Sequence, residues 1–169
     1  TESSQTHYLQ SIKLKFFMML QLNDHNKHEF EPAHTCEHII NQTMIRMFNC
    51  GRAVSAHVER KKSKLDFRMS IEPSEQQMLR LEEEVNRIIS QDLPVTMSYI
   101  TQEEAKQFFD LNRLPDDASD TVRVVKIGDY DQCLCIGAHV EHTSEIGTFK
   151  LLSYSFSEGV LRLRWKVVQ

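Results

Sequence analysis

The C-terminal segment carries the pattern that most constrains the fold. From Val160 to Val168, apolar and basic residues alternate one by one: Leu161, Leu163, Trp165 and Val167 with Arg162, Arg164 and Lys166. Successive side chains of a strand point to opposite faces of its sheet, so this alternation is typical of a strand buried on one face only. The sequence therefore predicts a sheet with one face on a core and basic side chains on the other face.

Two other segments have helical periodicity. Apolar residues recur at helical spacing from Pro32 to about Phe48 and from Ser74 to about Gln91, where Ser74 and Gln77 form a capping box. A short helix at 101–109 and strands at 54–58, 64–71, 94–100, 121–127, 134–140 and 148–155 complete the expected elements. Because strands outnumber helices and often neighbour each other, we expect an α+β domain with helices packed on a largely antiparallel sheet.

The length of 169 residues predicts one domain. The sequence holds 5 Gly, 4 Pro and no internal repeat, so no linker between domains is visible. We expect residues 31–169 to form the domain, and residues 1–30 to be an N-terminal extension or first strand region that packs on it.

Charge and hydropathy narrow the class of protein. Twenty Lys and Arg against 24 Asp and Glu give a net charge of −4, which excludes a strongly basic protein that coats nucleic acid but allows a local basic face. No apolar stretch is long enough to span a bilayer and no signal core is visible, so we expect a cytoplasmic protein with no membrane or DNA partner. The four cysteines are then expected to be thiols or ligands.

Two short motifs contain candidate metal ligands. His34 and His38 lie four residues apart near the start of the first helix, so both imidazoles can reach one ion. Cys135 and His139 are also four apart, around Gly137. A thiolate combined with imidazoles favours Zn²⁺ over Mg²⁺ and Ca²⁺, so the four residues are expected to bind zinc. Four protein ligands would close the site, and a catalytic role would need a displaceable ligand or an expanded shell.

Glu37 leaves the chemistry of this site open. The motif from His34 to His38 also matches H-x-x-E-H, the signature of inverted zinc peptidases with the glutamate as general base. S-ribosylhomocysteine lyases have a similar helix and one distant cysteine. The pattern favours a simpler interpretation, in which Glu37 is a solvated carboxylate stabilised by the helix dipole. No general base is assigned, and Glu37 is the one catalytic candidate.

Several motifs follow one another in a specific order: His34 to His38, Leu65-Asp66-Phe67, Thr121 to Asp129, Cys135 to His139, and Thr143 to Lys150. In this order and spacing they resemble the editing domain of alanyl-tRNA synthetases and its short free-standing relatives, the alanyl-tRNA editing hydrolases. Threonyl-tRNA synthetase editing domains share the two His/Cys motifs, but the block ending at Lys150 is nearer the alanyl type. The resemblance covers most of the chain, from His34 to Leu163.

The resemblance implies a zinc-dependent, ATP-independent hydrolase that acts in trans on mischarged tRNA, with Ser- or Gly-tRNA(Ala) as the expected substrate. The family's C-G-G-T-H motif reads Cys135-Ile136-Gly137-Ala138-His139 here, which keeps both ligands and removes a threonine hydroxyl and one glycine. The alternatives are a catalytically weakened relative that serves as a tRNA-binding or structural module, or another zinc hydrolase or lyase that uses the H-x-x-E-H helix.

Contacts with tRNA require positive charge. Arg60, Lys61, Lys62 and Lys64 form the only dense basic run, and Arg162 and Arg164 share one face of the last strand. These six residues are the candidate tRNA-binding set. A solvated turn and an ordinary polar strand face are equally consistent with the same pattern.

Overall fold

A computed structural model describes residues 30–112, 114 and 118–169. The expected N-terminal region, apart from Phe30, lies outside the described residues. The described residues form an α+β arrangement in which all pairs of neighbouring strands are antiparallel, as predicted, but the strands form two sheets rather than one.

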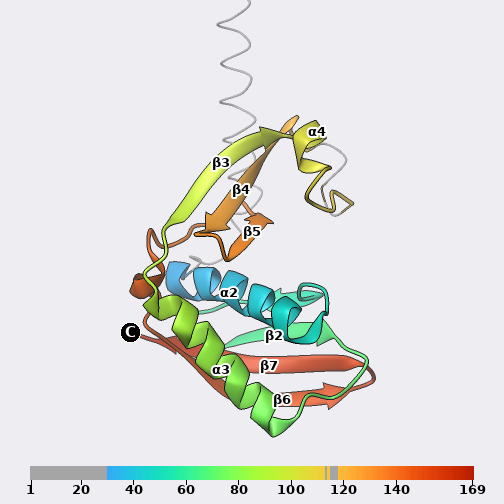
Figure 1. The fold of residues 1–169 in the computed structure, drawn as a ribbon, viewed down its shortest axis with the longest axis vertical. Helices are drawn as coiled ribbons and strands as arrows, with labels where there is room; N and C mark the ends of the chain where they lie inside the picture. The colour runs from blue at the N-terminus through green and yellow to red at the C-terminus, as the bar shows by residue number, and fades with distance from the viewer. Residues whose placement is uncertain (1–29, 113, 115–117) are drawn as a thin grey trace, which may run out of the picture.

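The larger sheet has the strand order β1-β2-β7-β6. Its strands are β1 (Ser55–His57), β2 (Ser63–Arg68), β7 (Val160–Val168) and β6 (Thr148–Ser157). Helices α2 (Glu31–Phe48) and α3 (Glu75–Ser90) pack together on one face of this sheet (Figure 1). The main core lies between these helices and the sheet, and its largest side chains are Trp165, Phe67, Phe149, Ile39, Ile40 and Met44.

The smaller sheet has the order β3-β4-β5 and stands above α2 in Figure 1. Its strands are β3 (Val95–Thr101), β4 (Thr121–Ile127) and β5 (Asp131–Leu134). The short helix α4 (Gln102–Ala105) follows β3 at the far end of this sheet, and the 3₁₀ helix η1 (Thr143–Ile146) leads the chain back to β6.

The helix boundaries follow the expected signals. Helix α2 has Pro32 in its first turn and ends before Asn49, whose φ of 52° is the left-handed conformation that commonly ends a helix. Helix α3 begins with the predicted capping box, in which Gln77 N donates to the Ser74 hydroxyl and Ser74 N donates to the Gln77 side chain. Helix α4 begins with a capping box of Thr101 and Glu104, but it is shorter than the predicted helix at 101–109, and Phe108 beyond it is exposed.

The outer edge of β6 is closed by polar side chains of α3. Asn86 donates to the Phe149 carbonyl at 3.0 Å and accepts from the Phe149 amide at 2.8 Å. The Leu151 amide donates to the Glu82 carboxylate at 2.7 Å. These bonds occupy backbone groups that an edge strand would otherwise offer to another chain, and they fix α3 along the sheet.

One predicted strand is wrong. The segment 134–140 was expected to be extended, but β5 ends at Leu134 and residues 135–140 form an irregular loop. The carbonyls of Cys135 and Gly137 accept hydrogen bonds from the Arg123 side chain instead of a neighbouring strand. A strand rises about 3.3 Å per residue, which would hold residues four apart about 13 Å away from each other. The loop therefore allows Cys135 and His139 to approach.

Within the described ranges, no helix combines the length and the apolar character needed to cross a bilayer.

Candidate metal centre

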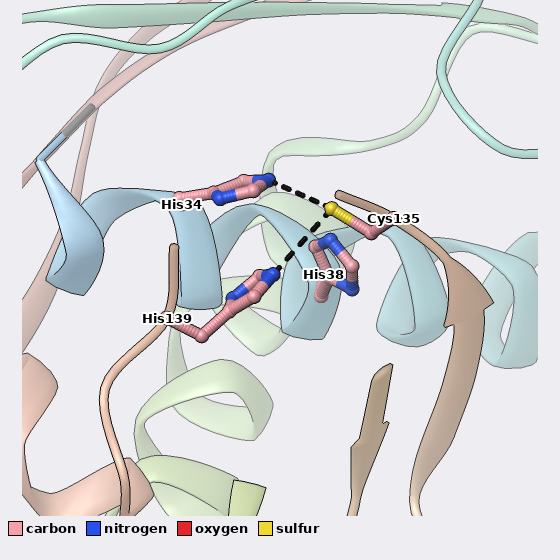
Figure 2. A group of neighbouring side chains, drawn as sticks. All are labelled: His34, His38, Cys135 and His139. Atoms are coloured by element: carbon pink, nitrogen blue, oxygen red, sulfur yellow. Dashed lines mark hydrogen bonds between the residues drawn. The ribbon is translucent and has the colours of Figure 1, made fainter. Parts of the chain in front are cut away.

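Four side chains from two separate parts of the fold converge at one point. His34 and His38 come from the first half of α2, and Cys135 and His139 come from the loop after β5 (Figure 2). Their potential ligand atoms all lie within 4.8 Å of one another. His38 and His139 are buried, at 3% and 8% exposed, and the other two side chains are half-buried. The structure thus brings together the four residues expected from the sequence.

The distances in this cluster suit a tetrahedral zinc ion. Cys135 Sγ lies 3.4 Å from His34 Nε2 and 3.5 Å from His139 Nε2. Tetrahedral bonds of about 2.0–2.1 Å to nitrogen and about 2.3 Å to sulfur place those two atoms about 3.5 Å apart. Three imidazoles and one thiolate are also a donor set that selects zinc over Mg²⁺ or Ca²⁺. The residues therefore fit zinc in both geometry and chemistry.

The opposite nitrogens of two of these rings have partners that orient them. His34 Nδ1 donates to the Ala138 carbonyl at 2.9 Å, and His139 Nδ1 lies 3.0 Å from the Thr35 hydroxyl. The same hydroxyl accepts a bond from the Val140 amide, which ties the loop to α2. Such contacts fix the tautomer of a ligating histidine and direct its Nε2 toward the metal position.

Asp131 faces Nδ1 of His38, as Ala138 and Thr35 face Nδ1 of His34 and His139. Its Oδ2 lies 3.7 Å from His38 Nδ1, a buried nitrogen with no hydrogen bond of its own. The carboxylate is fully buried and is held by a two-point contact with Arg52, at 2.8 and 3.2 Å, and by Gln42 at 3.0 Å. Asp131 therefore faces the back of the His38 ring from a fixed position, as second-layer carboxylates of zinc sites do.

The cluster strongly shifts the ionisation of its members. Burial alone would raise the pKa of Cys135, but hydrogen bonds from His139, His34 and His38 outweigh it and lower the pKa to about 3. Burial opposes the charged form of His38, whereas Asp131 and Cys135 favour it and raise its pKa to about 9. Burial lowers the pKa of His139 to about 4. Cys135 is thus a thiolate at neutral pH, which is the form that binds metals.

Glu37 lies beside the cluster and is largely buried, unlike the solvated carboxylate that the sequence pattern favoured. Its Oε2 is 3.7 Å from His38 Nε2, and its side chain is 16% exposed. The Asn41 side chain donates to its Oε1. A carboxylate held at this distance from a ligand nitrogen can reach a molecule bound at the cluster.

Sequence reasoning missed the residues that hold the cluster. Asp131 and Arg52 belong to no short motif, and Thr35 lies inside the motif from His34 to His38 but was given no role there. Their partners lie 79 to 104 positions away in the sequence. Arg123 donates hydrogen bonds from β4 to the Cys135 and Gly137 carbonyls and so shapes the loop of residues 135–140, which we call the ligand loop. The one available signal was the polar residue Asp131 at the start of a strand, where its side chain is 0% exposed.

The predicted tRNA-binding residues lie elsewhere. Arg60, Lys61 and Lys62 are exposed in the turn between β1 and β2, while Lys64, Arg162 and Arg164 lie on the larger sheet. Arg162 already forms a two-point ion pair with Asp66, at 2.7 and 2.8 Å. The structure therefore divides the six residues into a turn and a sheet face, both apart from the cluster itself.

Comparison with known proteins gives a consistent result. Residues 122–164 match the family model described as the threonyl and alanyl tRNA synthetase second additional domain. Alanine–tRNA ligases are similar over much of the chain. The ligase of Geobacillus kaustophilus is 36% identical over 125 residues, which are 72% of this chain and 14% of that protein. The ligase of Caldicellulosiruptor saccharolyticus is 33% identical over 132 residues, 77% of this chain and 15% of that protein.

A third relative, the alanine–tRNA ligase of Treponema denticola, is 33% identical over 151 residues, 85% of this chain and 24% of that protein. The chain thus spans less than a quarter of the length of these three relatives. The matched range runs from Val122 in β4 through β5, the ligand loop, η1 and β6 to Arg164 in β7, and it includes Cys135 and His139. Together with the synthetase relatives, this match shows that the chain belongs to the alanyl-tRNA synthetase editing-domain family.

Proposed function

We propose that this domain hydrolyses the ester bond that joins a wrong amino acid to the 3′ end of tRNA, with Ser-tRNA(Ala) or Gly-tRNA(Ala) as the substrate. The observation that carries the proposal is the four-ligand cluster in a member of the editing-domain family. Helix α2 and the ligand loop supply all four ligands within the described residues, so the metal site itself needs no second chain. We propose that the reaction proceeds in trans, on tRNA charged by another enzyme. We place it in the cytoplasm, where tRNA is charged.

His34, His38, Cys135 and His139 would hold the zinc ion. When bound, zinc would supply Lewis-acid polarisation of an ester carbonyl and a lower pKa for a water molecule. The contribution of the chain is orientation: Ala138, Thr35 and Asp131 lie at the Nδ1 side of the three rings and direct their Nε2 atoms inward.

Glu37 is the group best placed to take part in proton transfer. Its carboxylate lies beside the cluster, and Asn41 restricts its motion. A general base must lie within hydrogen-bond reach of the proton that it accepts, directly or through one water. We propose that Glu37 accepts a proton from the attacking water and returns it to the leaving tRNA hydroxyl.

The ligand loop also supports a second candidate function. Ile136 is 54% exposed directly after Cys135, and Ala138 has no hydroxyl that could bind an amino-acid substrate. A closed set of four ligands is, moreover, typical of structural zinc sites. The alternative is therefore a tRNA-binding or structural module that retains zinc and lacks hydrolytic activity.

The test is deacylation of Ser-tRNA(Ala), Gly-tRNA(Ala) and Ser-tRNA(Thr), with zinc measured in the same protein sample. We expect release of serine or glycine from tRNA(Ala) by the wild-type chain. His38→Ala should lose zinc and activity together, and Glu37→Gln should keep zinc and lose at least tenfold in rate, as expected for removal of a general base.

His142→Ala is the matched control, because His142 is exposed and lies outside the cluster. It should keep both zinc and activity. Zinc bound at one equivalent with no hydrolysis of any of the three substrates would reject the proposal in favour of the binding module. Hydrolysis that persists in His38→Ala without zinc would reject the role of the metal.

A further inference from the structure

The outward face of the larger sheet is densely basic although the chain as a whole is acidic. Helices α2 and α3 cover the other face, and within the described ranges no helix covers this one (Figure 1). Outward positions of its strands carry six cations and one carboxylate, Asp66. The six are Lys64, Arg68, Lys150, Arg162, Arg164 and Lys166, and we refer to them as the basic sheet face.

Two pairs of like charges stand directly opposite each other on this face. Lys64 of β2 is the register partner of Arg164 of β7, and Lys150 of β6 is the register partner of Lys166. Like charges at directly opposed positions destabilise a sheet. These pairs therefore cost stability, which indicates that the face serves something other than folding.

Local carboxylates neutralise only part of this charge. Asp66 pairs with Arg162, and Glu82 of α3 lies 3.9 Å from Lys150 at the edge of the sheet. For Lys64 and Lys166 no ion pair is found among the described residues. The centre of the face thus keeps a net positive charge.

The basic turn between β1 and β2 connects this face to the metal centre. The Arg60 guanidinium lies 4.2 Å above the ring of Phe30, and the Phe30 carbonyl accepts a hydrogen bond from the His34 amide. Arg60, Lys61 and Lys62 therefore lie beside the end of α2 that carries the ligands, and Lys64 follows at the start of the face. Positive charge therefore runs from the N-terminal end of α2, over the turn, and across the sheet.

We propose that the basic sheet face binds the phosphate backbone of the tRNA helix, while the basic turn guides the single-stranded end toward the metal centre. The inference rests on the proposed function for the identity of the RNA. Lysine and arginine bind phosphate through charge and hydrogen bonds, and double-stranded RNA is recognised mainly through its backbone and shape. A sheet face with cations on alternate residues of β7, and with Lys64 and Arg68 on β2, provides such contacts.

An anionic membrane is the other polyanion to consider, and the face does not favour it. Membrane-surface binding depends on apolar side chains that enter the lipid as well as on charge. The outward positions of β2, and those of β7 from Arg162 to Lys166, are all charged. Exposed apolar side chains lie only at the margins of the described sheet, at Leu152 on the edge strand β6 and at Val168 at the end of β7. RNA is therefore the occupant that we propose.

Lys64→Glu separates this inference from a structural explanation. It places a carboxylate opposite Arg164, so the protein should become more stable, with a melting temperature about 1–3 °C higher. Binding of uncharged tRNA(Ala), measured by fluorescence anisotropy over a salt series, should weaken about tenfold at low salt. The slope of log affinity against log salt should fall by about one to two. Lys166→Glu, opposite Lys150, should act in the same way.

Lys106→Glu is the matched control, because it makes the same change in net charge at an exposed side chain directly after α4, at the far end of the smaller sheet. It should leave tRNA affinity within about twofold. If Lys64→Glu and Lys106→Glu weakened tRNA binding equally, the effect would come from net charge alone, and the inference would be overturned. Unchanged binding in Lys64→Glu, or wild-type binding to phosphatidylserine vesicles but not to tRNA, would overturn it as well.

The two proposals can fail separately. Uncharged tRNA needs no hydrolysis, so Lys64-dependent binding without deacylation would retain the basic sheet face and reject the enzymatic function. Deacylation by the wild-type chain, with tRNA binding that is indifferent to Lys64 and Lys166, would retain the function and reject the face.

Discussion

The two sheets of this domain differ in what they contribute. The larger sheet packs on α2 and α3 and buries Trp165, Phe67, Leu161 and Leu163 completely. The smaller sheet contributes only one fully buried residue, Ile127, to this main core. The residues of β3, which is an edge strand of the smaller sheet, are all exposed or half-buried. The first sheet therefore provides stability, whereas the second holds a ligand loop in place.

The metal centre lies where these two regions meet. Helix α2, which is anchored on the larger sheet, supplies His34 and His38, and the loop after β5 supplies Cys135 and His139. Folding and metal binding should therefore respond differently to substitutions in the two regions. Two results would contradict this difference between the sheets. One is a variant in the smaller sheet that unfolds the domain, and the other is a core variant that changes zinc affinity alone.

The largest effect is expected in the larger sheet. Phe67→Ala removes a fully buried ring from the central strand β2, and its free energy of unfolding should fall by about 3–5 kcal/mol because a cavity remains. Urea unfolding followed by circular dichroism measures this loss. A loss below about 1 kcal/mol would show that the core does not lie where the larger sheet places it.

The next effect is expected at the junction. Asp131→Asn removes the negative charge behind His38 Nδ1, and zinc affinity, measured by competition with a chelator, should fall about 10- to 100-fold. Asp129→Asn is the matched control, since that carboxylate is exposed two positions earlier and pairs only with Lys126 in the described chain. Equal zinc affinities for the two variants would contradict a positioning role for Asp131.

A smaller, pH-dependent effect is expected on the outer face of the larger sheet. The ion pair with Arg162 lowers the pKa of Asp66 below its ordinary value of 3.8. The pair therefore stabilises the folded state above about pH 3.8, and this contribution is lost as the pH falls through the lowered pKa. Asp66→Asn should cost about 1 kcal/mol or less at pH 7, since solvent screens the pair. Unfolding curves that differ equally at pH 7 and pH 3 would contradict this assignment.

The smallest effect is expected in the smaller sheet. Met97→Ala shortens a side chain that is 44% exposed on β3, so the free energy of unfolding should change by no more than about 0.5 kcal/mol. Thermal unfolding beside Phe67→Ala provides the comparison. A loss near that of Phe67→Ala would mean that the smaller sheet is part of the main folding core.

The sequence predicted most elements because their signals are local. Alternation over Val160–Val168 and the capping box of Ser74 and Gln77 depend on neighbouring residues only, and both are confirmed. The predicted strand at 134–140 failed because its conformation depends on Arg123, which bonds the loop from another strand. Apolar character alone does not distinguish such a loop from a strand.

The candidate site shows the same division. The spacing of His34 with His38, and of Cys135 with His139, indicated two half-sites, and the structure brings them together. Asp131 and Arg52 were not predicted, because their contacts join residues 79 positions apart. Polar contacts between residues so far apart in the chain produce no periodic pattern in the sequence.

X-ray absorption at the zinc edge would show whether α2 and the ligand loop together build one metal site. The wild-type chain with one equivalent of zinc should show about three nitrogens at 2.0–2.1 Å and one sulfur near 2.3 Å, and Cys135→Ser should lose the sulfur alone. A shell of nitrogen and oxygen only, or sulfur ligation that survives in Cys135→Ser, would contradict the account.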